Sequence, residues 1–399
     1  MADAAIPNGE FSFTRLEKVI FGAGAVARLG AELDRRGVER VVIATGKSLG
    51  ASPLFTRVAD AVGPHLAGVY KGISQHVPAG TVRGLITELE RTRADCVISF
   101  GGGSPIDACK VAAASILNGR DMTLEGGKLD WALAFAPHES KDAIIHIAVP
   151  TTLSAGEYTP AGGVTNEETR RKAGVIDARI QARTVINDPE LTVDTPDWLW
   201  VATGMRALDH AVEAIYSTRA QPFTDALAVR AIRLLVEHLP GSIATKGAAS
   251  LAHRGHCQMA AWFSLYGAIN VRLGISHALG HKIGPTWNVA HGVTSCITLP
   301  HGMRFMAGIA PQRFGGIAEG LGIPFDAADP RPAALACADR VAQFIAQFDV
   351  PHTLKAAGVK REDVAAIVAP IHEEINFAQV VDRPVTVDEI GGLLAAAYE

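Results

Sequence analysis

Three short runs of apolar and β-branched residues, each followed by turn residues and then by a helical pattern, constrain the fold of this chain most. The runs are Val41–Ala44, Val97–Phe100 and Ile144–Val149. Such runs are typical of strands that are buried on both faces of a parallel sheet. Helical segments such as Pro53–Val62 and Val82–Thr92 separate them. The alternation predicts an α/β domain in which helices cover both faces of the sheet.

The pattern changes after Pro196, where strand signals become rare and long alanine-rich helical periodicities take over. The helical segments are Trp200–Ser217, Thr224–His238, Ser250–Leu273 and Ala333–Phe348. Asp188–Pro196 between the two patterns has the proline and aspartate content of a loop. We therefore expect an α/β domain over residues 1–190 and an all-helical domain over residues 191–399.

Composition narrows the class of protein. The chain has 399 residues, enough for two domains, and 48% are hydrophobic. The net charge of −4 with no basic cluster makes nucleic acid an unfavourable partner. Five cysteines without C-x-x-C spacing favour a reduced, cytoplasmic protein. We see no signal peptide and no apolar stretch long enough for a membrane span.

A glycine-rich loop follows the second apolar run, in VISFGGGSPIDACK (Val97–Lys110). Glycines let a backbone turn tightly and approach a ligand closely. Ser104 has the position of an N-cap, with Pro105 as the first helical residue and Asp107 as the capping-box partner. The helix start then predicts a pyrophosphate site, although an ordinary strand-to-helix turn is the alternative and Asp107 fits a cap better than a ligand. The candidate phosphate-binding residues are Gly101, Gly102, Gly103, Ser104 and Asp107.

A second loop, PTTLSAGEYTP (Pro150–Pro160), follows the third apolar run. Open α/β sheets bind ligands at the edge where the strands end, so the hydroxyls of Thr151, Thr152 and Ser154 are candidate nucleotide contacts. Turn and cap chemistry explains the same residues equally well.

Four of the 14 histidines fall between Leu273 and Arg304. His277 and His281 are four residues apart, which places them on one face of a helix. We expect Gly284-Pro285 to end that helix and His291 to lie at the start of the next. Three imidazoles aimed at one point suit zinc, ferrous iron or acid–base chemistry. Chance packing of core or surface histidines is the alternative.

Together these stretches resemble the iron-containing alcohol dehydrogenase superfamily, with maleylacetate reductase-like enzymes nearest. The resemblance covers nearly the whole chain and is carried by FGAGA (Phe21–Ala25), the two loops above, ATGMRALDHAVEA (Ala202–Ala214) and the histidine-rich stretch. It implies a dinucleotide-binding α/β domain, an all-helical catalytic domain, and a site in the cleft between them. It also implies a homodimer and hydride transfer between NAD(P) and an alcohol or carbonyl.

The resemblance assigns cofactor residues one by one. The glycine loop falls on Gly101–Ser104, the nicotinamide-side threonines on Thr151 and Thr152, and a ribose-binding lysine on Lys172. Family members often carry an aspartate after the first strand, which binds the ribose 2′-hydroxyl and repels a 2′-phosphate. Here the turn carries Gly46, Lys47 and Ser48, so we expect NADPH to be accepted, alongside NADH.

The family's metal site uses one aspartate and three histidines. The histidines match His210, His277 and His291, and His281 matches a further histidine near the substrate. The place of the aspartate is taken by Arg206, which is cationic, only donates hydrogen bonds and cannot bind a metal. The adjacent acid, Asp209, lies about 100° away from His210 around a helix and is a poor substitute.

We therefore favour a site without metal, in which Arg206 points into the cleft and binds a substrate carboxylate or polarises a carbonyl oxygen. One of the imidazoles then supplies the proton, and His281 and His277 are the strongest candidates among the four, which include His210. The alternative for Arg206 is a solvated helix residue paired with Asp209 or another acid.

The leading hypothesis is an NAD(P)H-dependent reductase of a small carbonyl compound, possibly carboxylate-bearing. A second is a zinc- or iron-dependent alcohol dehydrogenase with a three-histidine site. A third is a cyclising lyase similar to dehydroquinate synthase, which regenerates its NAD internally. A fourth is a nucleotide-binding protein without activity, in which the metal site has decayed to Arg206.

Overall fold

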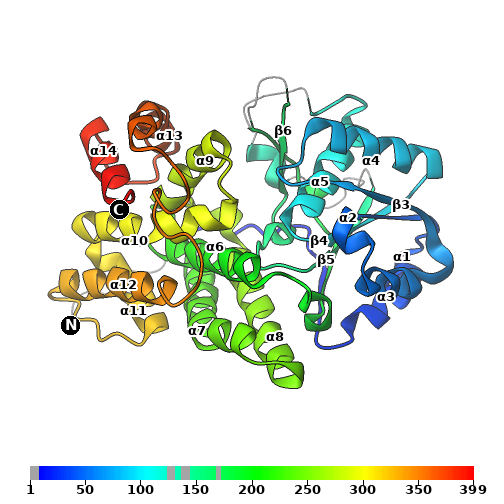
Figure 1. The fold of residues 1–399 in the computed structure, drawn as a ribbon, viewed down its shortest axis with the longest axis horizontal. Helices are drawn as coiled ribbons and strands as arrows, with labels where there is room; N and C mark the ends of the chain where they lie inside the picture. Colours follow the sequence, from blue (N-terminus) through cyan, green and yellow to red (C-terminus); the bar gives the residue numbers. More distant parts are fainter. Residues whose placement is uncertain (1–8, 124–130, 136–143, 168–171) are drawn as a thin grey trace.

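A parallel sheet with helices on both faces and a group of packed helices form the two halves of the chain (Figure 1). The computed structural model describes residues 9–123, 131–135, 144–167 and 172–399. The sheet's six strands, in the order in which they lie side by side, are β1 (Lys18–Phe21), β8 (Thr184–Asn187), β5 (Ile145–Pro150), β4 (Cys96–Gly101), β2 (Val41–Gly46) and β3 (Leu66–Ile73). Every neighbouring pair is parallel, so all the strands end at one edge.

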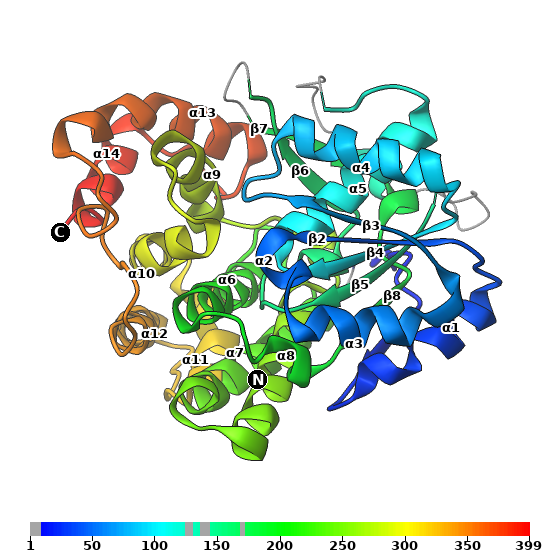
Figure 2. The ribbon, with the colours of Figure 1, turned by 45° about the vertical axis from the view of Figure 1, so that its right-hand side comes forward.

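The strands bury alternate side chains against helices on opposite faces, as the continuous apolar runs predicted. Val42 and Val97 pack with α4 and α5, whereas Val41 and Ile98 pack with α1 and α3. The helices of this half are α1 (Leu29–Arg36), α2 (Lys47–Gly50), α3 (Pro53–Val62), α4 (Ala79–Thr92) and α5 (Gly103–Asn118). A separate antiparallel hairpin, β6 (Ala161–Thr165) and β7 (Lys172–Ile176), extends beside the sheet (Figure 2).

The second half is helical throughout the described residues and packs around α6, which is buried from Trp200 to its end. Its α-helices are α6 (Asp197–Ile215), α7 (Pro222–Ala244), α8 (Gly247–Leu265), α9 (Ile275–Trp287), α10 (His291–Ile309), α11 (Gly315–Leu321), α12 (Pro330–Ile345), α13 (Val368–Ala378) and α14 (Val387–Ala396). α7, α8 and α10 all contact α6. Among these and the other described helices, none combines the length and hydropathy that crossing a bilayer would require.

The predicted fold class is confirmed: the chain combines a parallel α/β half with an all-helical half. The boundary between residues 190 and 191 stays a prediction. Two local expectations are wrong. The turn after β2 is the short helix α2, and Pro285 lies inside α9, which continues to Trp287. Asn288 ends α9 because it adopts the left-handed conformation, with a φ of 54°.

Glu32 on α1 connects this helix to β1 and β8 at the edge of the sheet. Its buried carboxylate accepts hydrogen bonds from Lys18 Nζ on β1 (2.8 Å), Thr184 Oγ1 on β8 (2.7 Å) and Arg36 Nε (2.8 Å). Arg35 donates two more. Burial alone would raise the pKa of Glu32, but these donors hold the pKa well below its usual value of 4.5.

We predict that Glu32→Gln lowers the free energy of unfolding by about 2 kcal/mol at pH 7, because charge-assisted hydrogen bonds are lost. The folded-state pKa is depressed, so this stability is present above pH 4.5 and is lost as the pH falls below it. Urea unfolding at several pH values measures both effects. Glu90→Gln, the same charge change on an exposed position of α4, is the control. Equal stabilities of the two variants at pH 7 would contradict the role of Glu32.

Candidate active site

A cleft of about 470 Å³ lies between the two halves of the chain. The sheet half contributes His76 and the β6–β7 hairpin, including Gly163. The helical half contributes α9 and α13 and the start of α10, which present His281, Glu374 and His291. A small-molecule site of this size between two domains is common among enzymes.

The glycine loop and the threonine loop meet at the edge where β4 and β5 end. Gly101 pairs with Pro150, and the Thr151 N–H donates to the Gly101 carbonyl over 2.9 Å. Gly101 has a φ of 142°, which side chains rarely allow. A Cβ on Gly102 would lie 3.0 Å from Thr152 Cγ2, so the two loops pack without space for a side chain there.

The start of α5 differs in detail from the expected cap. Gly102 is the N-cap and Gly103 the first helical residue, so the prediction of Ser104 as N-cap in a capping box is wrong. The helix starts two residues earlier because the extended conformation of Gly102 leads directly into it. No side chain caps the first N–H groups, and such groups bind anions at many phosphate sites.

The other cofactor candidates lie at the same edge or beside the cleft. Gly46 ends β2, and Lys47 and Ser48 begin α2 with exposed side chains. Ser154 lies 3.4 Å from the position of a Cβ on Gly103. The backbone of Lys172 begins β7, and its side chain lies outside the described part of the chain.

A hydrogen bond connects the threonine loop to the helical half. The N–H of Leu153 donates to Thr203 Oγ1 over 3.1 Å. Thr203 lies on α6 one turn before Arg206. The edge with the candidate phosphate site and the helix with the candidate catalytic residues are therefore joined directly.

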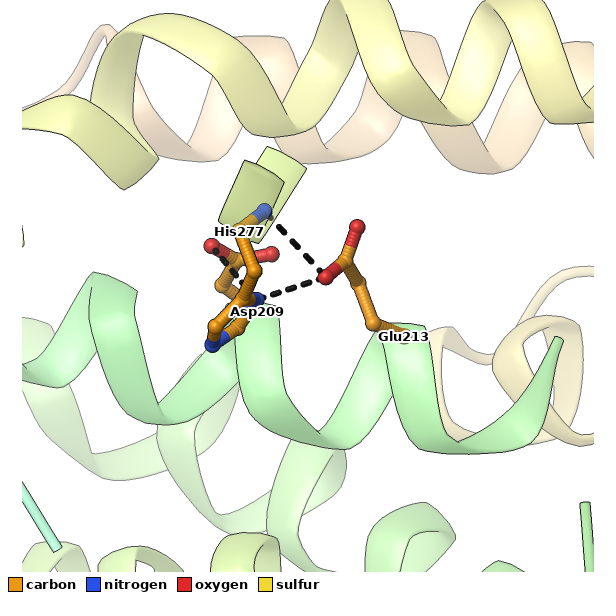
Figure 3. Close-up of side chains that lie close together, drawn as sticks. All are labelled: Asp209, Glu213 and His277. Atoms are coloured by element: carbon orange, nitrogen blue, oxygen red, sulfur yellow. Dashed lines mark hydrogen bonds and ion pairs between the residues drawn. The ribbon is translucent and has the colours of Figure 1, made fainter. Parts of the chain in front are cut away.

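Three ionisable side chains meet in the interior beside α6 (Figure 3). Asp209 and Glu213 come from successive turns of α6, and His277 comes from α9. Asp209 Oδ2 accepts from Ser295 Oγ (2.6 Å) and Ser276 Oγ, and it lies 3.3 Å from Arg206 Nη1. The Asp209 carboxylate also lies 3.6 Å from His277 Nδ1, a contact that the sequence did not predict.

Glu213 fixes the orientation of His277. Its Oε2 is 2.6 Å from His277 Nδ1 and accepts the Gly274 N–H, and its Oε1 accepts from the Ser276 N–H and the Tyr216 hydroxyl. One proton between the carboxylate and Nδ1 leaves Nε2 of His277 as an acceptor. That Nε2 is buried and has no hydrogen-bond partner in the described structure.

Burial governs the charges of the cluster. It raises the pKa of Asp209, and the negative charge of Glu213 adds to this effect. It also raises the pKa of Glu213. Burial lowers the pKa of His210 and His277 well below 6.5, with the positive charge of Arg206 as the next cause. Both imidazoles are therefore neutral near pH 7.

The four expected histidines form a row that leads from the interior to the cleft. The ring centroids of His210 and His277 are 5.0 Å apart, those of His277 and His281 6.5 Å, and those of His281 and His291 6.0 Å.

Gly292 lets the start of α10 pack directly on α6. A Cβ on Gly292 would lie 2.6 Å from the carbonyl oxygen of Ala202 on α6, so no side chain fits at this position.

Arg206 does not point into the cleft as expected. It is 5% exposed, and its Nη1 donates to Asp209 and to Ser295 Oγ. Arg206 instead pairs with Asp209, which was the alternative expectation for this residue. The pair is buried, however, and not solvated as that alternative assumed. The guanidinium is thus a fixed positive charge behind the imidazoles.

The interior cluster of Asp209, Glu213 and His277 does not fit the metal that the family name implies. Asp209, Glu213 and His277 are close enough to share an ion, but Asp209 Oδ2, both oxygens of Glu213 and Nδ1 of His277 already take part in hydrogen bonds. The position four residues before His210 holds a guanidinium. The same repulsion that lowers the pKa of His210 and His277 acts on a divalent cation.

Sequence reasoning missed Glu213 and Glu374. Glu213 had a signal, because it lies three residues after His210 and four after Asp209 on one helix. Glu374 had none. Its carboxylate lies 2.8 Å from His281 Nδ1 across 93 residues of sequence, and only the packing of α13 on α9 brings them together.

Comparison with known proteins agrees with this architecture. Residues 17–189 match the family described as iron-containing alcohol dehydrogenase, and residues 200–398 match the C-terminal region of the Fe-containing alcohol dehydrogenase family. Lactaldehyde reductase of Escherichia coli K12 is 31% identical over 90% of this chain and 92% of its own. Maleylacetate reductase of Burkholderia cepacia is 30% identical over 96% of each chain.

A solved structure described as alcohol dehydrogenase from Oenococcus oeni superposes with a TM-score of 0.86 at 28% identity, covering 98% of this chain and 100% of that one. Both halves of the sequence and the fold therefore lead to one assignment. The chain belongs to the iron-containing alcohol dehydrogenase family and is an oxidoreductase that acts on alcohol or carbonyl groups.

Proposed function

We propose that this protein is an NAD(P)H-dependent reductase of a small carbonyl compound, preferably an oxo acid, that works without a catalytic metal. The observation that carries the proposal is the buried Arg206, which stands where the family places a ligating carboxylate. Arg206 does not line the cleft, but its guanidinium would place a fixed positive charge behind the imidazoles, where a metal ion would otherwise supply one. Lys282 lines the cleft beside its ion-pair partner Glu374 and would be a second cation for an acidic substrate.

The proposed cofactor site runs along the edge where β2, β4 and β5 end. Gly101–Ser104 would bind the pyrophosphate through the N–H groups at the start of α5. Thr151 and Thr152 would lie on the nicotinamide side. Lys47 and Ser48 are exposed beside Gly46, with no carboxylate among these three residues, which supports acceptance of a 2′-phosphate.

The proton would come from the imidazole row. A reduced nicotinamide cofactor, when bound, would supply hydride to the carbonyl carbon, and the oxygen would then need a proton. His281 is the best placed of the four, since it lines the cleft and its side chain is 51% exposed. His277 is nearly buried and neutral, so it would pass or accept protons behind His281.

One observation favours the metal-dependent alternative. Nε2 of His277 and Nδ1 of His210 are buried without hydrogen-bond partners in the described structure, and imidazole nitrogens of this kind bind zinc or ferrous iron. With His291 they would form a three-histidine site. Arg206 argues against it, and metal content decides between the two.

We predict that the protein oxidises both NADH and NADPH with maleylacetate, faster than with lactaldehyde, since maleylacetate carries carboxylates and lactaldehyde is neutral. Absorbance of the reduced cofactor at fixed protein concentration measures the rates. Oxidation of neither cofactor with either compound would contradict the reductase. Use of NADH without measurable use of NADPH would contradict only the assignment of Lys47 and Ser48.

We predict that Gly102→Val weakens NADH binding at least about tenfold, as loss of one hydrogen bond to a charged group would. The new Cβ would displace Thr152 as well as approach the phosphates. Fluorescence titration with NADH measures the affinity, and circular dichroism checks the fold. Gly308→Val on α10, where a Cβ meets nothing within 4 Å, is the control. Unchanged affinity in a folded Gly102→Val protein would exclude the loop as the phosphate site.

We predict that the purified wild-type protein carries little iron or zinc and keeps its activity in chelator. Arg206→Asp should instead take up about one zinc or ferrous ion per chain, since it adds a carboxylate beside three imidazoles. Arg206→Met removes the positive charge without adding a ligand and should take up none. Elemental analysis of the three proteins gives the result. A stoichiometric ion in the wild type would overturn the metal-free proposal and favour the three-histidine enzyme.

A further inference from the structure

A hydrogen-bonded pair separate from the interior cluster lies at the cleft. His281 on α9 and Glu374 on α13 both line it, and Nδ1 of the imidazole is 2.8 Å from Oε1 of the carboxylate. The views in Figures 1 and 2 both place α13 beside α9.

Glu374 is held as an anion. Its second oxygen, Oε2, is 3.0 Å from Nζ of Lys282, the residue after His281. Burial alone would raise the pKa of Glu374, but the hydrogen bonds from His281 and Lys282 outweigh it and lower the pKa. An ionised carboxylate only accepts hydrogen bonds, so Nδ1 of His281 must carry the hydrogen.

The His281 ring lies nearly parallel to a neighbouring imidazole. The rings of His281 and His291 lie 5° from parallel with centroids 6.0 Å apart. With Nδ1 directed to Glu374, the opposite nitrogen, Nε2, is the one left for the cleft. A histidine without such a partner populates both tautomers.

We propose that Glu374 is a positioning residue that holds the hydrogen of His281 on Nδ1, so that Nε2 is the atom that exchanges a proton with the substrate oxygen. The inference rests on the proposed reductase function and adds to it the residue that selects the reacting nitrogen. It is the arrangement by which a buried carboxylate orients a catalytic histidine in hydrolytic triads, placed here at a hydride-transfer site.

The proposed reduction conserves protons and electrons. In reduction, the nicotinamide cofactor gives a hydride to the carbonyl carbon, and the carbonyl π electrons move to the oxygen. That oxygen takes the proton from Nε2–H of the imidazolium, which leaves the ring neutral with its hydrogen on Nδ1. Oxidation of the alcohol runs the same transfers backwards. In both directions Glu374 balances the charge of the imidazolium.

The first test reads the tautomer and needs no substrate. Protein labelled with ¹⁵N-histidine, with the His281 signals assigned through His281→Ala, should show Nδ1 protonated and Nε2 unprotonated in the neutral ring. Glu374→Met, which removes the acceptor at similar length, should give a mixture of tautomers. Glu373→Met, the same change at the exposed neighbouring position of α13, should leave the signals unchanged. Protonation of Nε2 in the wild type, or identical signals in Glu374→Met, would refute the proposal.

The second test asks whether Glu374 acts through His281. With maleylacetate and NADH, Glu374→Met should lower kcat about tenfold or more, as loss of an oriented general acid does, and leave the KM for NADH within about twofold. In a His281→Ala background, Glu374→Met should lower kcat no further. An equal loss in both backgrounds would show a structural role only. If maleylacetate is not reduced at all, the reductase proposal fails while the tautomer measurement still decides the role of Glu374.

Discussion

The buried contact between Arg206 and Asp209 is the interaction on which the rest of the site depends. An isolated guanidinium in the interior would be very costly, and so would an isolated carboxylate beside Glu213. Together they compensate each other, and the oxygens of Asp209 and Glu213 also accept from hydroxyls and backbone N–H groups and lie against Nδ1 of His277. The network connects α6, α9 and α10 in one arrangement, and this arrangement determines the positions of the imidazoles.

The same network explains how this chain departs from the ligand pattern that its family resemblance implies. Moving a cation into the ligand's place and an acid three residues later changes the charges on two adjoining faces of one helix. The backbone does not have to change, and the histidines keep their spacing. The proposed loss of the metal ion would therefore leave the fold of the family unchanged.

Sequence predicted the fold well and the site unevenly, for physical reasons. Buried parallel strands carry continuous apolar runs, so β2, β4 and β5 were found, whereas the four-residue strands β1 and β8 have only two or three apolar residues each and were missed. The histidines of α9 and α10 were identified because their spacing is local. The direction of Arg206 was predicted wrongly, since it depends on Ser295, which is 89 residues distant. Glu374 escaped notice because no pattern in a sequence reports which helix faces will pack.

The contact between Gly292 and Ala202 has a consequence for how this enzyme can diversify. Because a methyl group at residue 292 would collide with the backbone of α6, the helical wall of the cleft is fixed as a unit, down to single residues. The opposite wall includes the hairpin of β6 and β7, which forms a two-stranded sheet of its own beside the six-stranded sheet. New substrate ranges, in nature or in a laboratory library, are therefore more accessible through β6, β7 and His76 than through the histidine-bearing helices.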